Sequence, residues 1–550
     1  MHVRTLVTAG PPTSNGDLHL GHLSGPYTAG DIYTRYLRLQ RRDVHYVSAA
    51  DDHQSYVALK ATQTGRTPQD VADEYGLVIK TSLDKAGVAM DLFGQPSRSP
   101  RYIRFLQDFV ATLHAKGILF ARTSDVPYCE TCDRMLFEAH IKGRCAHCGA
   151  GSDGGICEAC GHPNKGSDLE SPRCAACGTP PSSSRPSTRL FFPLNNYRDY
   201  LRGYAQNAVM NPHARALCDS LLAKELPDVA VTQPADWGIP VPIDGFEAQC
   251  ISAWFELGPH YLAVCEMLHE NGGGPEWREF WTGDADVIQC FGFDSAYFHI
   301  VLFAALFHAY DPAIRPPKGF IVNEFYRLDG RKFSTSRKHA LWASDFLDEY
   351  ASDAVRFHLC LTRPESEQTN FTVAEFLQTL NGELVGVWDC WLKALATKMS
   401  GQQAPRAETW QPEQLRFHQR LARLVSEIGA SYELDGFSPH RAVRLLSELV
   451  RETVAFATAN VHHADNPHRQ DENRTNIALE LAAARALALT ARPVMPQFAE
   501  RLWTDLGHPF PIDQAEWENV PSLLSPGRPL HLSALGYFSP SLPQDKVLAA

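Results

Sequence analysis

Short apolar runs alternate with amphipathic stretches through the first part of the chain. The run Leu6-Val7-Thr8-Ala9 ends at a Gly-Pro-Pro sequence, which predicts a strand followed by a loop. A periodic stretch from about 18 to 40 predicts a helix, and the run Val44 to Ser48 predicts a second strand. Helical periodicity follows at about 68 to 85 and 102 to 116. Strands that alternate with helices in this way predict an α/β fold with a parallel sheet.

This alternation is interrupted between about 121 and 188, where Gly, Ser, Pro and Cys replace any regular period. We therefore predict an insertion that depends on cross-links rather than on a hydrophobic core. The alternation resumes with a strand at Val287 to Phe291, a helix at about 297 to 309 and a strand at 319 to 322. The sheet is thus expected to continue after the insertion.

Beyond about 375 nearly all patterns are helical. Leu, Val and Ala recur three and four residues apart through 441 to 460 and 476 to 505, which predicts a helical bundle domain. The Pro-rich end, from about 521 to 550, predicts an extended strap.

The cysteines are concentrated in the insertion, which holds eight of the 14 in the chain. They form the Cys-x-x-Cys pairs Cys129/Cys132, Cys145/Cys148, Cys157/Cys160 and Cys174/Cys177. Two residues between thiolates allow a tight turn to direct both sulfurs at one ion, and two such pairs complete the tetrahedral shell of Zn²⁺. A disulfide framework is the alternative, but no secretory signal is present at the N-terminus. We predict two structural zinc ions, with the pairing of the four knuckles left open.

Charge and hydropathy narrow the class of protein. The 51 Lys and Arg against 63 Asp and Glu give a formal net charge of −12, which argues against indiscriminate binding of nucleic acid but allows a local basic groove. No apolar run reaches the roughly 18 to 20 residues that span a bilayer. We therefore expect a cytoplasmic protein that does not bind membranes.

Two polar clusters follow the first two predicted strands. Asn15 to His22 places two histidines around a glycine at a predicted helix start, and Asp51-Asp52-His53 ends the second strand. Ligands of parallel sheets bind at the carboxyl ends of the strands, so both clusters are expected in one pocket. A helix start next to glycine can approach a phosphate, and two imidazoles can donate hydrogen bonds to it. Solvent-exposed loop histidines are the alternative for this motif taken alone.

A basic, hydroxyl-rich loop, Gly330 to Arg337, is the second part of this chemistry, because cationic groups can neutralise a phosphorus under attack. His19-Leu20-Gly21-His22 and Lys332-Phe333-Ser334-Thr335-Ser336 together resemble the HIGH-like and KMSKS-like motifs of class I aminoacyl-tRNA synthetases. Within that class the chain is similar over its whole length to the methionyl-tRNA synthetase family, because Trp237-Gly-Ile-Pro-Val-Pro and the order of the motifs match it.

The resemblance implies a Rossmann-type sheet with a zinc-knuckle insertion and a C-terminal α-helical bundle. The domains that we expect are a catalytic domain in two halves, a connective insertion, a region with the KMSKS-like loop and stem contacts, and an anticodon-binding-like domain with the strap. The two halves of the catalytic domain are 1–120 and 236–320, and the connective insertion is 121–235. The region with the KMSKS-like loop and stem contacts is 321–375, and the anticodon-binding-like domain with the strap is 376–550.

The resemblance also implies site residues, with Mg²⁺ accompanying ATP. The catalytic residues are His19, His22, Lys332, Ser334, Ser336 and Arg337. ATP would be bound by Gly21, Gly292, Asp294 and Lys332. The amino acid would be bound by Asp51, Trp254, Leu257, Tyr261 and His299. A carboxylate is the natural partner of a substrate ammonium, and Asp51 is our choice, with Asp52 as the alternative.

The sequence departs from the family at several positions. Thr335 replaces the second Lys of the KMSKS-like loop, and Leu257 and Ser295 stand where a small and an apolar residue are typical. Positions where the family reads the anticodon with Asn, Arg and Trp are here Cys390, Ala394 and His468. Their replacement removes stacking and guanidinium groups that read bases.

Three hypotheses follow. The first is an ATP-dependent ligase, acting as a monomer, that converts an amino acid, methionine by resemblance, to its adenylate and transfers it to tRNA. The second is a paralogue with the same adenylation chemistry and another amino acid or a non-tRNA acceptor, which the changed anticodon positions favour. The third is an inactive zinc-stabilised RNA-binding or regulatory protein, which the retained His19, His22, Lys332 and Asp294 oppose.

Overall fold

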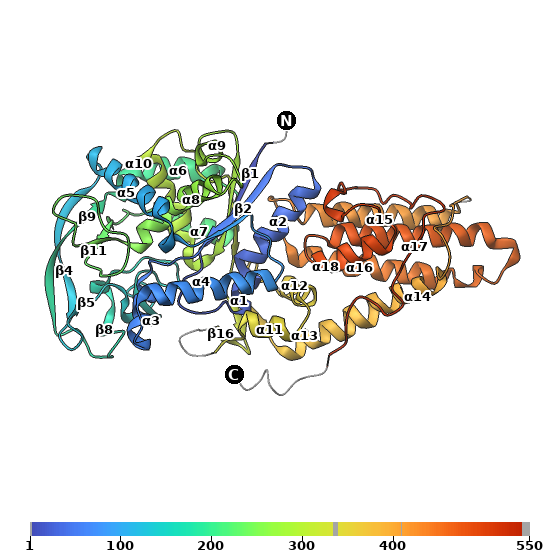
Figure 1. The fold of residues 1–550 in the computed structure, drawn as a ribbon, viewed down its shortest axis with the longest axis horizontal. Helices are drawn as coiled ribbons and strands as arrows, with labels where there is room; N and C mark the ends of the chain where they lie inside the picture. The colour runs from blue at the N-terminus through green and yellow to red at the C-terminus, as the bar shows by residue number, and fades with distance from the viewer. Residues whose placement is uncertain (1–2, 334–338, 409, 542–550) are drawn as a thin grey trace. The chain divides into compact units, whose positions relative to one another are not determined.

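The protein is described by a computed structural model, which covers residues 3–333, 339–408 and 410–541. Its internal contacts divide the chain into two compact units, each built from separate segments (Figure 1). The first comprises Met1–Leu18, His45–Ser82 and Ala89–Glu324, and the second comprises His19–Val44, Leu83–Val88 and Phe325–Ala550. The domain boundaries expected from the sequence stay a prediction.

A five-stranded sheet is the centre of the first unit, in the order β14-β13-β1-β2-β3. β1 pairs in parallel with β13, β13 with β14, and β2 with β3. All of β1 is buried, as expected of a parallel sheet covered on both faces. The predicted parallel α/β sheet is confirmed, and all four predicted strands belong to it. The strands are β1 Thr5–Ala9, β2 Val44–Ala49, β3 Leu92–Gly94, β13 Asp286–Gly292 and β14 Gly319–Asn323.

Helices of the first unit pack beside this sheet and against one another (Figure 1). Phe109 on α5 stacks on Tyr310 at the end of α10, with ring centroids 4.2 Å apart. The helix α8 is buried along most of its length, so its few polar side chains lie in the interior. The helices are α3 Ser55–Thr64, α4 Pro68–Lys85, α5 Pro100–Ala115, α6 Arg198–Asn207, α7 Pro212–Leu222, α8 Ala253–Glu270, α9 Trp277–Trp281 and α10 Phe303–Tyr310.

The insertion is richer in strands than the sequence predicted. β4 (Phe120–Cys129) and β9 (Ser183–Phe192) form a long antiparallel pair, although half of the side chains of β9 are exposed and its sequence shows no alternation of apolar and polar residues to recognise. Leu136, Ile141 and Leu169 pack with two of the cysteines in a small buried cluster, so the insertion has some apolar packing around its cysteines. The remaining strands are β5 Arg134–Met135, β6 Glu138–Arg144, β7 Gly151–Gly154, β8 Glu170–Cys174, β10 Val229–Ala230, β11 Thr232–Gln233 and β12 Cys250–Ile251.

The second unit starts with the helix predicted at 18 to 40. This helix is confirmed but interrupted, because Gly25 leaves helical geometry with ψ −123° next to Pro26, and Pro cannot donate a helical hydrogen bond. A three-stranded sheet in the order β16-β15-β17 follows later in the chain. These elements are α1 Leu20–His22, the π-helical turn Leu23–Tyr27, α2 Thr28–Leu39, β15 Tyr326–Leu328, β16 Arg331–Lys332 and β17 Thr369–Phe371.

The rest of the second unit is helical, which confirms the predicted bundle. α15, α16, α17 and α18 lie side by side (Figure 1, orange to red), and Phe417 on α15 stacks on Phe456 on α16 at 4.0 Å. Residues 521–541 form neither helix nor strand, as predicted for the strap. The helices are α11 Ala343–Glu349, α12 Ser352–Leu361, α13 Val373–Gln378, α14 Cys390–Lys398, α15 Pro412–Ala430, α16 Pro439–Ala459, α17 Gln470–Ala491 and α18 Pro496–Asp505, with a π-helical segment Thr379–Asp389 between α13 and α14.

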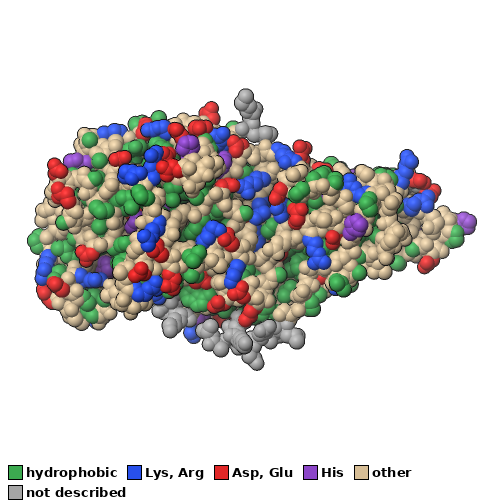
Figure 2. All heavy atoms as spheres, viewed as in Figure 1, with side chains coloured by type: hydrophobic (Ala, Val, Ile, Leu, Met, Phe, Trp, Pro, Cys, Tyr) green, Lys and Arg blue, Asp and Glu red, His purple; other side chains and the backbone are tan. Residues whose placement is uncertain are grey.

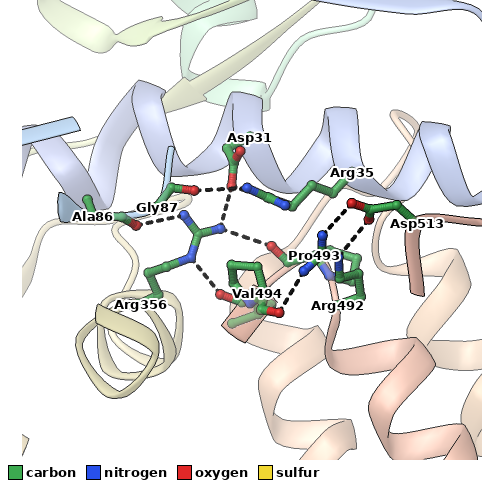
Figure 3. Close-up of polar contacts among 10 residues, drawn as sticks. Asp31, Arg35, Ala86, Gly87, Arg356, Arg492, Pro493, Val494 and Asp513 are labelled. Atoms are coloured by element: carbon green, nitrogen blue, oxygen red, sulfur yellow. Dashed lines mark hydrogen bonds and ion pairs between the residues drawn. The ribbon is translucent and has the colours of Figure 1, made fainter. Parts of the chain in front are cut away.

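A buried arginine joins distant segments of the second unit (Figure 3). The guanidinium of Arg356 on α12 donates to Asp31 Oδ2 on α2 at 2.6 Å. It also donates to the carbonyl oxygens of Ala86, Pro493 and Val494. A buried charge needs such a complete set of partners, so this contact fixes α2 to the helical domain.

The surface carries charges of both signs. On the face drawn in Figure 2, Lys and Arg side chains are interspersed with Asp and Glu side chains, in keeping with the formal net charge of −12. Within the part of the chain that the structure describes, no helix combines the length and the apolar character needed to cross a membrane.

Candidate functional site

His19 and His22 form a compact pair at the start of α1, in the second unit. Their rings stack with centroids 3.6 Å apart. The backbone N–H of His22 donates to His19 Nδ1 at 3.2 Å, and the backbone N–H of His19 donates to His22 Nδ1 at 3.1 Å. Since both Nδ1 atoms accept hydrogen bonds, the neutral rings carry their protons on Nε2. The pair can therefore offer two Nε2–H donors to an anionic ligand.

Both histidines are neutral at pH 7. Burial, together with the neighbouring His22 and Lys332, lowers the pKa of His19 well below its ordinary value. Burial and then Lys332 lower the pKa of His22 to about 4. The cluster therefore combines two neutral imidazoles, which can donate hydrogen bonds, with the positive charge of Lys332.

Gly21 makes the ring stack possible. A Cβ at this position would lie 3.0 Å from His19 Nδ1 and 3.2 Å from Phe333 Cδ2, closer than van der Waals contact allows. Phe333 itself stacks on His19 at 4.7 Å. The glycine of the motif thus lets the loop that contains Phe333 lie against the histidines.

Phe333 in the KMSKS-like loop and Leu341 after it both contact the same histidine motif. Lys332 on β16 lies with Nζ 4.3 Å from the ring centroid of Phe325, and the backbone N–H of Leu20 donates to Leu341 O at 3.1 Å. The structure thus brings His19, His22 and Lys332 together. The predicted residues Ser334, Ser336 and Arg337, and Thr335 between them, lie outside the described residues.

In the first unit, the two neighbouring carboxylates after β2 have different surroundings. Asp52 accepts from Ser14 Oγ at 2.7 Å and from the Oγ and backbone N–H of Ser97 at 2.7 and 3.0 Å. Asp51 accepts a weaker bond from Thr13 Oγ1 at 3.4 Å. Burial, and then the charges of Glu256 and Asp52, raise the pKa of Asp51 well above its ordinary value. Asp52 is saturated by local donors, and this favours Asp51 as the partner of an ammonium.

The predicted side-chain pocket is built on α8 and the helix after β13. Tyr261 donates its hydroxyl proton to His299 Nε2 at 2.7 Å, because His299 Nδ1–H is used for Ser295 O at 2.9 Å. Burial lowers the pKa of His299 to about 4, so this pair is uncharged. Trp254 stacks on Phe298 at 4.3 Å with nearly parallel rings, and Leu257 is buried.

Asp294 follows the carboxyl end of β13. A Cβ on Gly292 would lie 2.7 Å from Asp294 Oδ1, so the carboxylate folds back over the glycine. The segment Trp237 to Pro242 reaches the other cluster, since Trp237 Nε1–H donates to the backbone oxygen of Asp52 at 2.8 Å. The first unit thus brings Asp294 and Asp51 to the carboxyl ends of β13 and β2. That the histidine motif and Asp51 line one pocket stays a prediction.

A buried polar chain beside Asp51 was not predicted from the sequence. His53, Tyr102, Glu256 and His260 are linked by hydrogen bonds of 2.8 to 3.0 Å. Glu256 and His260 stand one helical turn apart on α8, and two polar residues at that spacing in an apolar helix were the available signal. Their partners come from other elements, so no pattern in the sequence indicated that these residues are linked.

The eight clustered cysteines form two separate groups. Cys129 and Cys132 meet Cys174 and Cys177, while Cys145 and Cys148 meet Cys157 and Cys160, with the four sulfurs of each group within 4.8 Å of one another. Neighbouring sulfurs across the pairs lie 3.5 to 4.0 Å apart. Zn–S bonds of about 2.3 Å in a tetrahedron place sulfurs about 3.8 Å apart. Both groups fit a metal ion, and disulfides, which need about 2.05 Å, are excluded by these distances.

The tight turn of each Cys-x-x-Cys knuckle explains which type of residue follows its second cysteine. Gly149, Gly161 and Gly178 have φ between 69° and 76°, and each donates its N–H to the oxygen of the first cysteine. In the remaining knuckle Asp133 takes this place with φ 49°, a conformation that Asp tolerates better than most residues. The four knuckles thus share a positive φ after the second cysteine.

A cavity of about 520 Å³ lies between the insertion and the body of the first unit. Its lining includes Trp254, Phe298, Glu138 and Arg189. Tyr261, Leu257 and His299 are absent from the lining that the described residues provide. Of the predicted amino-acid-binding residues, Trp254 is therefore the one that faces open space here.

The positions corresponding to anticodon readers are in the second unit. Cys390, Ala394 and His468 are exposed. Cys390 and Ala394 carry neither an aromatic ring nor a guanidinium, and His468 offers an imidazole in place of the indole that the resemblance leads us to expect.

Comparison with known proteins identifies close relatives. A family model described as tRNA synthetases class I (M) matches residues 5–393. A methionine–tRNA ligase of Thermomicrobium roseum is 31% identical, over 90% of this chain and 86% of that protein. One from Pyrococcus furiosus is 29% identical, over 91% of this chain and 71% of that protein. The structure of Mycobacterium tuberculosis methionyl-tRNA synthetase in complex with methionyl-adenylate has the same fold, with a TM-score of 0.79, 19% identity and coverage of 96% and 98%.

Proposed function

The chain belongs to the class I tRNA synthetase (M) family, and on this premise we propose how its residues carry out the reaction of a methionine–tRNA ligase. The carboxylate of methionine attacks the α-phosphorus of ATP, and pyrophosphate leaves. A ribose hydroxyl of the terminal adenosine of tRNA then attacks the carbonyl carbon of the adenylate, and AMP leaves. Both steps transfer a group without any redox change.

The observation that carries this proposal is the pair of Nε2–H donors on His19 and His22 beside Lys332. Charge accumulates on the phosphate oxygens as the α-phosphorus is attacked, and positioned donors stabilise it. Lys332 adds a cation for the leaving pyrophosphate. Ser334, Ser336 and Arg337 are proposed to complete this set, and Mg²⁺ bound with ATP would neutralise further phosphate charge.

The first unit is proposed to hold the other substrate groups. Asp51 pairs with the ammonium, the Tyr261 and His299 pair faces the side chain with Trp254 and Leu257, and Asp294 and Gly292 hold the ribose of ATP. An uncharged Tyr–His pair suits a thioether, which is a weak acceptor and a polarisable apolar group.

The two cysteine groups are proposed to bind one Zn²⁺ each. Four thiolates in each group leave no open position on a tetrahedral ion, so the ions stabilise the insertion and take no part in the reaction.

The test measures the exchange of pyrophosphate into ATP with each amino acid of a panel in turn. It then measures the charging of tRNA with a CAU anticodon. Methionine is expected to support both reactions. Absence of ATP turnover with every amino acid would refute the proposal and favour an inactive RNA-binding or regulatory protein.

A second candidate is supported by the exposed Cys390, Ala394 and His468. In that case the adenylate forms, but the acceptor is a different RNA or a small amine, or the amino acid is another one. Exchange with methionine and no charging of tRNA with a CAU anticodon would establish it.

A further inference from the structure

Two histidines lie beside the cysteine group that is formed by Cys145, Cys148, Cys157 and Cys160. The rings of His147 and His162 stack with their centroids 3.6 Å apart and an interplanar angle of 16°. One ring nitrogen of each histidine and the sulfur of Cys160 lie within 4.8 Å of one another. These three side chains form a second set of metal-ligand atoms, which shares one sulfur with the four-cysteine group.

The hydrogen bond of His162 leaves a lone pair for a metal ion. Its Nδ1–H donates to the backbone oxygen of Cys160 at 3.1 Å, so the neutral ring carries its lone pair on Nε2. A histidine that binds a metal commonly donates its other N–H to a backbone carbonyl in this way, which fixes the ring and its tautomer. The second ring, His147, is exposed, so an ion can reach the set from solvent.

The dimensions of the set suit a small tetrahedral ion. Zn–N bonds of about 2.0–2.1 Å and a Zn–S bond of about 2.3 Å place the ligand atoms about 3.3–3.6 Å apart. Because the two rings are nearly parallel, their lone pairs converge on one ion when one ring tilts, and the exposed His147 is the ring that can tilt at little cost. Two imidazoles and a thiolate then leave the fourth position to water.

Charge favours a second ion at this place. Four thiolates around one Zn²⁺ carry two more negative charges than the ion neutralises, and neighbouring positive charge is attracted to such a group. The two imidazoles are neutral ligands, so a second divalent ion removes this excess charge. The sulfur of Cys160 keeps lone pairs beyond the one that it gives to the first ion, and it can therefore bridge both ions. Imidazole and thiolate donors select transition-metal ions and Zn²⁺ over Mg²⁺ and Ca²⁺.

We propose that His147, His162 and Cys160 bind an exchangeable divalent ion of the Zn²⁺ and Co²⁺ class, with the sulfur of Cys160 as the bridge to the structural zinc. The inference rests on the proposed binding of Zn²⁺ by the four-cysteine group. Three protein ligands, of which one is shared, bind more weakly than four. The additional ion is therefore expected to leave the protein on desalting, whereas the two structural ions remain.

The test counts the Co²⁺ that the desalted full-length protein binds in equilibrium dialysis, with zinc measured in the same samples. The wild-type protein should contain two zinc ions and bind one further equivalent of Co²⁺. This Co²⁺ should show thiolate-to-cobalt charge-transfer absorption, because Cys160 is one of its ligands, whereas a site made of histidines alone lacks this band. A total of two metal ions, or a third ion without the charge-transfer band, would overturn the proposal.

Two variants remove one ligand each. His147→Ala removes the exposed imidazole, and His162→Asn keeps a donor for the oxygen of Cys160 but removes Nε2. Both should retain two zinc ions and lose the further equivalent of Co²⁺. His462→Ala is the matched control, because exposed His462 also contacts a second histidine, with ring centroids 4.3 Å apart, but belongs to neither cysteine group. This control should bind Co²⁺ as the wild type does.

His147→Ala changes a side chain at the surface, so it decides the question even if His162→Asn does not fold. Unchanged binding of Co²⁺ in His147→Ala would overturn the proposal. A desalted wild-type protein with fewer than two zinc ions would contradict the proposed structural sites instead. The role of the histidines is then still decided by the difference in bound Co²⁺ between the wild type and His147→Ala.

Discussion

Replacement of Arg356 by Met is expected to destabilise the second unit strongly. Arg356 and Asp31 are each 1% exposed at the side chain, and the guanidinium makes one charge-assisted and three backbone hydrogen bonds. Met retains the apolar stem, so the loss is electrostatic and leaves little cavity. Three carbonyl oxygens lose a buried donor, and Asp31 keeps Arg35 as a charged partner, with Arg35 Nε 2.8 Å from Asp31 Oδ2 (Figure 3).

Breaking a buried ion pair by removal of one partner costs about 3–5 kcal/mol. Because Arg35 remains on Asp31, we expect about 3 to 4 kcal/mol, a decrease of roughly 6–16 °C in the melting temperature of a unit of this size. Urea unfolding followed by tryptophan fluorescence measures the free energy of unfolding. Trp388 and Trp503 are buried in the second unit and report on it.

Arg444→Met is the matched control, because Arg444 is exposed on α16 and should change stability by no more than about 0.5 kcal/mol. A loss below about 1 kcal/mol in Arg356→Met would refute the reasoning, since it would mean that the desolvation cost of the pair cancels its attraction.

Four other results are expected. His22→Ala should lower kcat of pyrophosphate exchange about 10²- to 10³-fold, as loss of one transition-state donor does, with the Kd of methionine unchanged; full activity would contradict the donor role. Because the pKa of His22 is lowered to about 4, the ring is neutral throughout pH 6 to 8, and the wild-type kcat should show no titration of His22 in this range. A transition in kcat near pH 6.5 that His22→Ala abolishes would contradict the neutral state of His22. Gly21→Ala should impair exchange more than stability, because its Cβ would lie 3.0 Å from His19 Nδ1; wild-type kinetics would contradict the close approach. Cys157→Ser should lower the zinc content by one equivalent in elemental analysis, and an unchanged content would contradict the four-cysteine group.

Features that depend on neighbouring residues were predictable from the sequence. The alternation of short apolar runs and amphipathic stretches identifies β1, β2, β13 and β14, because each is buried on both faces. Each Cys-x-x-Cys pair lies within four consecutive residues, so the sequence alone predicted that these cysteines bind metal. The grouping of the pairs was not predictable, because it depends on the fold of the insertion, where β4 and β9 pair through backbone hydrogen bonds although half of the side chains of β9 are exposed.

Polar contacts between residues far apart in the sequence cannot be predicted from such patterns. His53 and Glu256 are separated by 203 residues, and Arg356 and Asp31 by 325. Each of these residues has a polar side chain whose partner is fixed only once the surrounding elements pack. The different surroundings of Asp51 and Asp52 were also not predictable, because the serines that donate to Asp52, Ser14 and Ser97, lie far apart in the sequence.

The proposed mechanism assigns adenylation and acceptor choice to different residues, so one activity can be retained when the other changes. In the proposed mechanism the histidine pair, Lys332 and Asp51 act on ATP and the amino acid, whereas Cys390, Ala394 and His468 stand where the family resemblance leads us to expect base-reading groups. Replacing a reader removes about 1–3 kcal/mol of stacking per base and leaves the donors on His19 and His22 untouched. A normal exchange rate therefore says nothing about the acceptor. Discrimination between tRNA with a CAU anticodon and other acceptors has to be measured on the transfer step, starting from adenylate already formed on the protein.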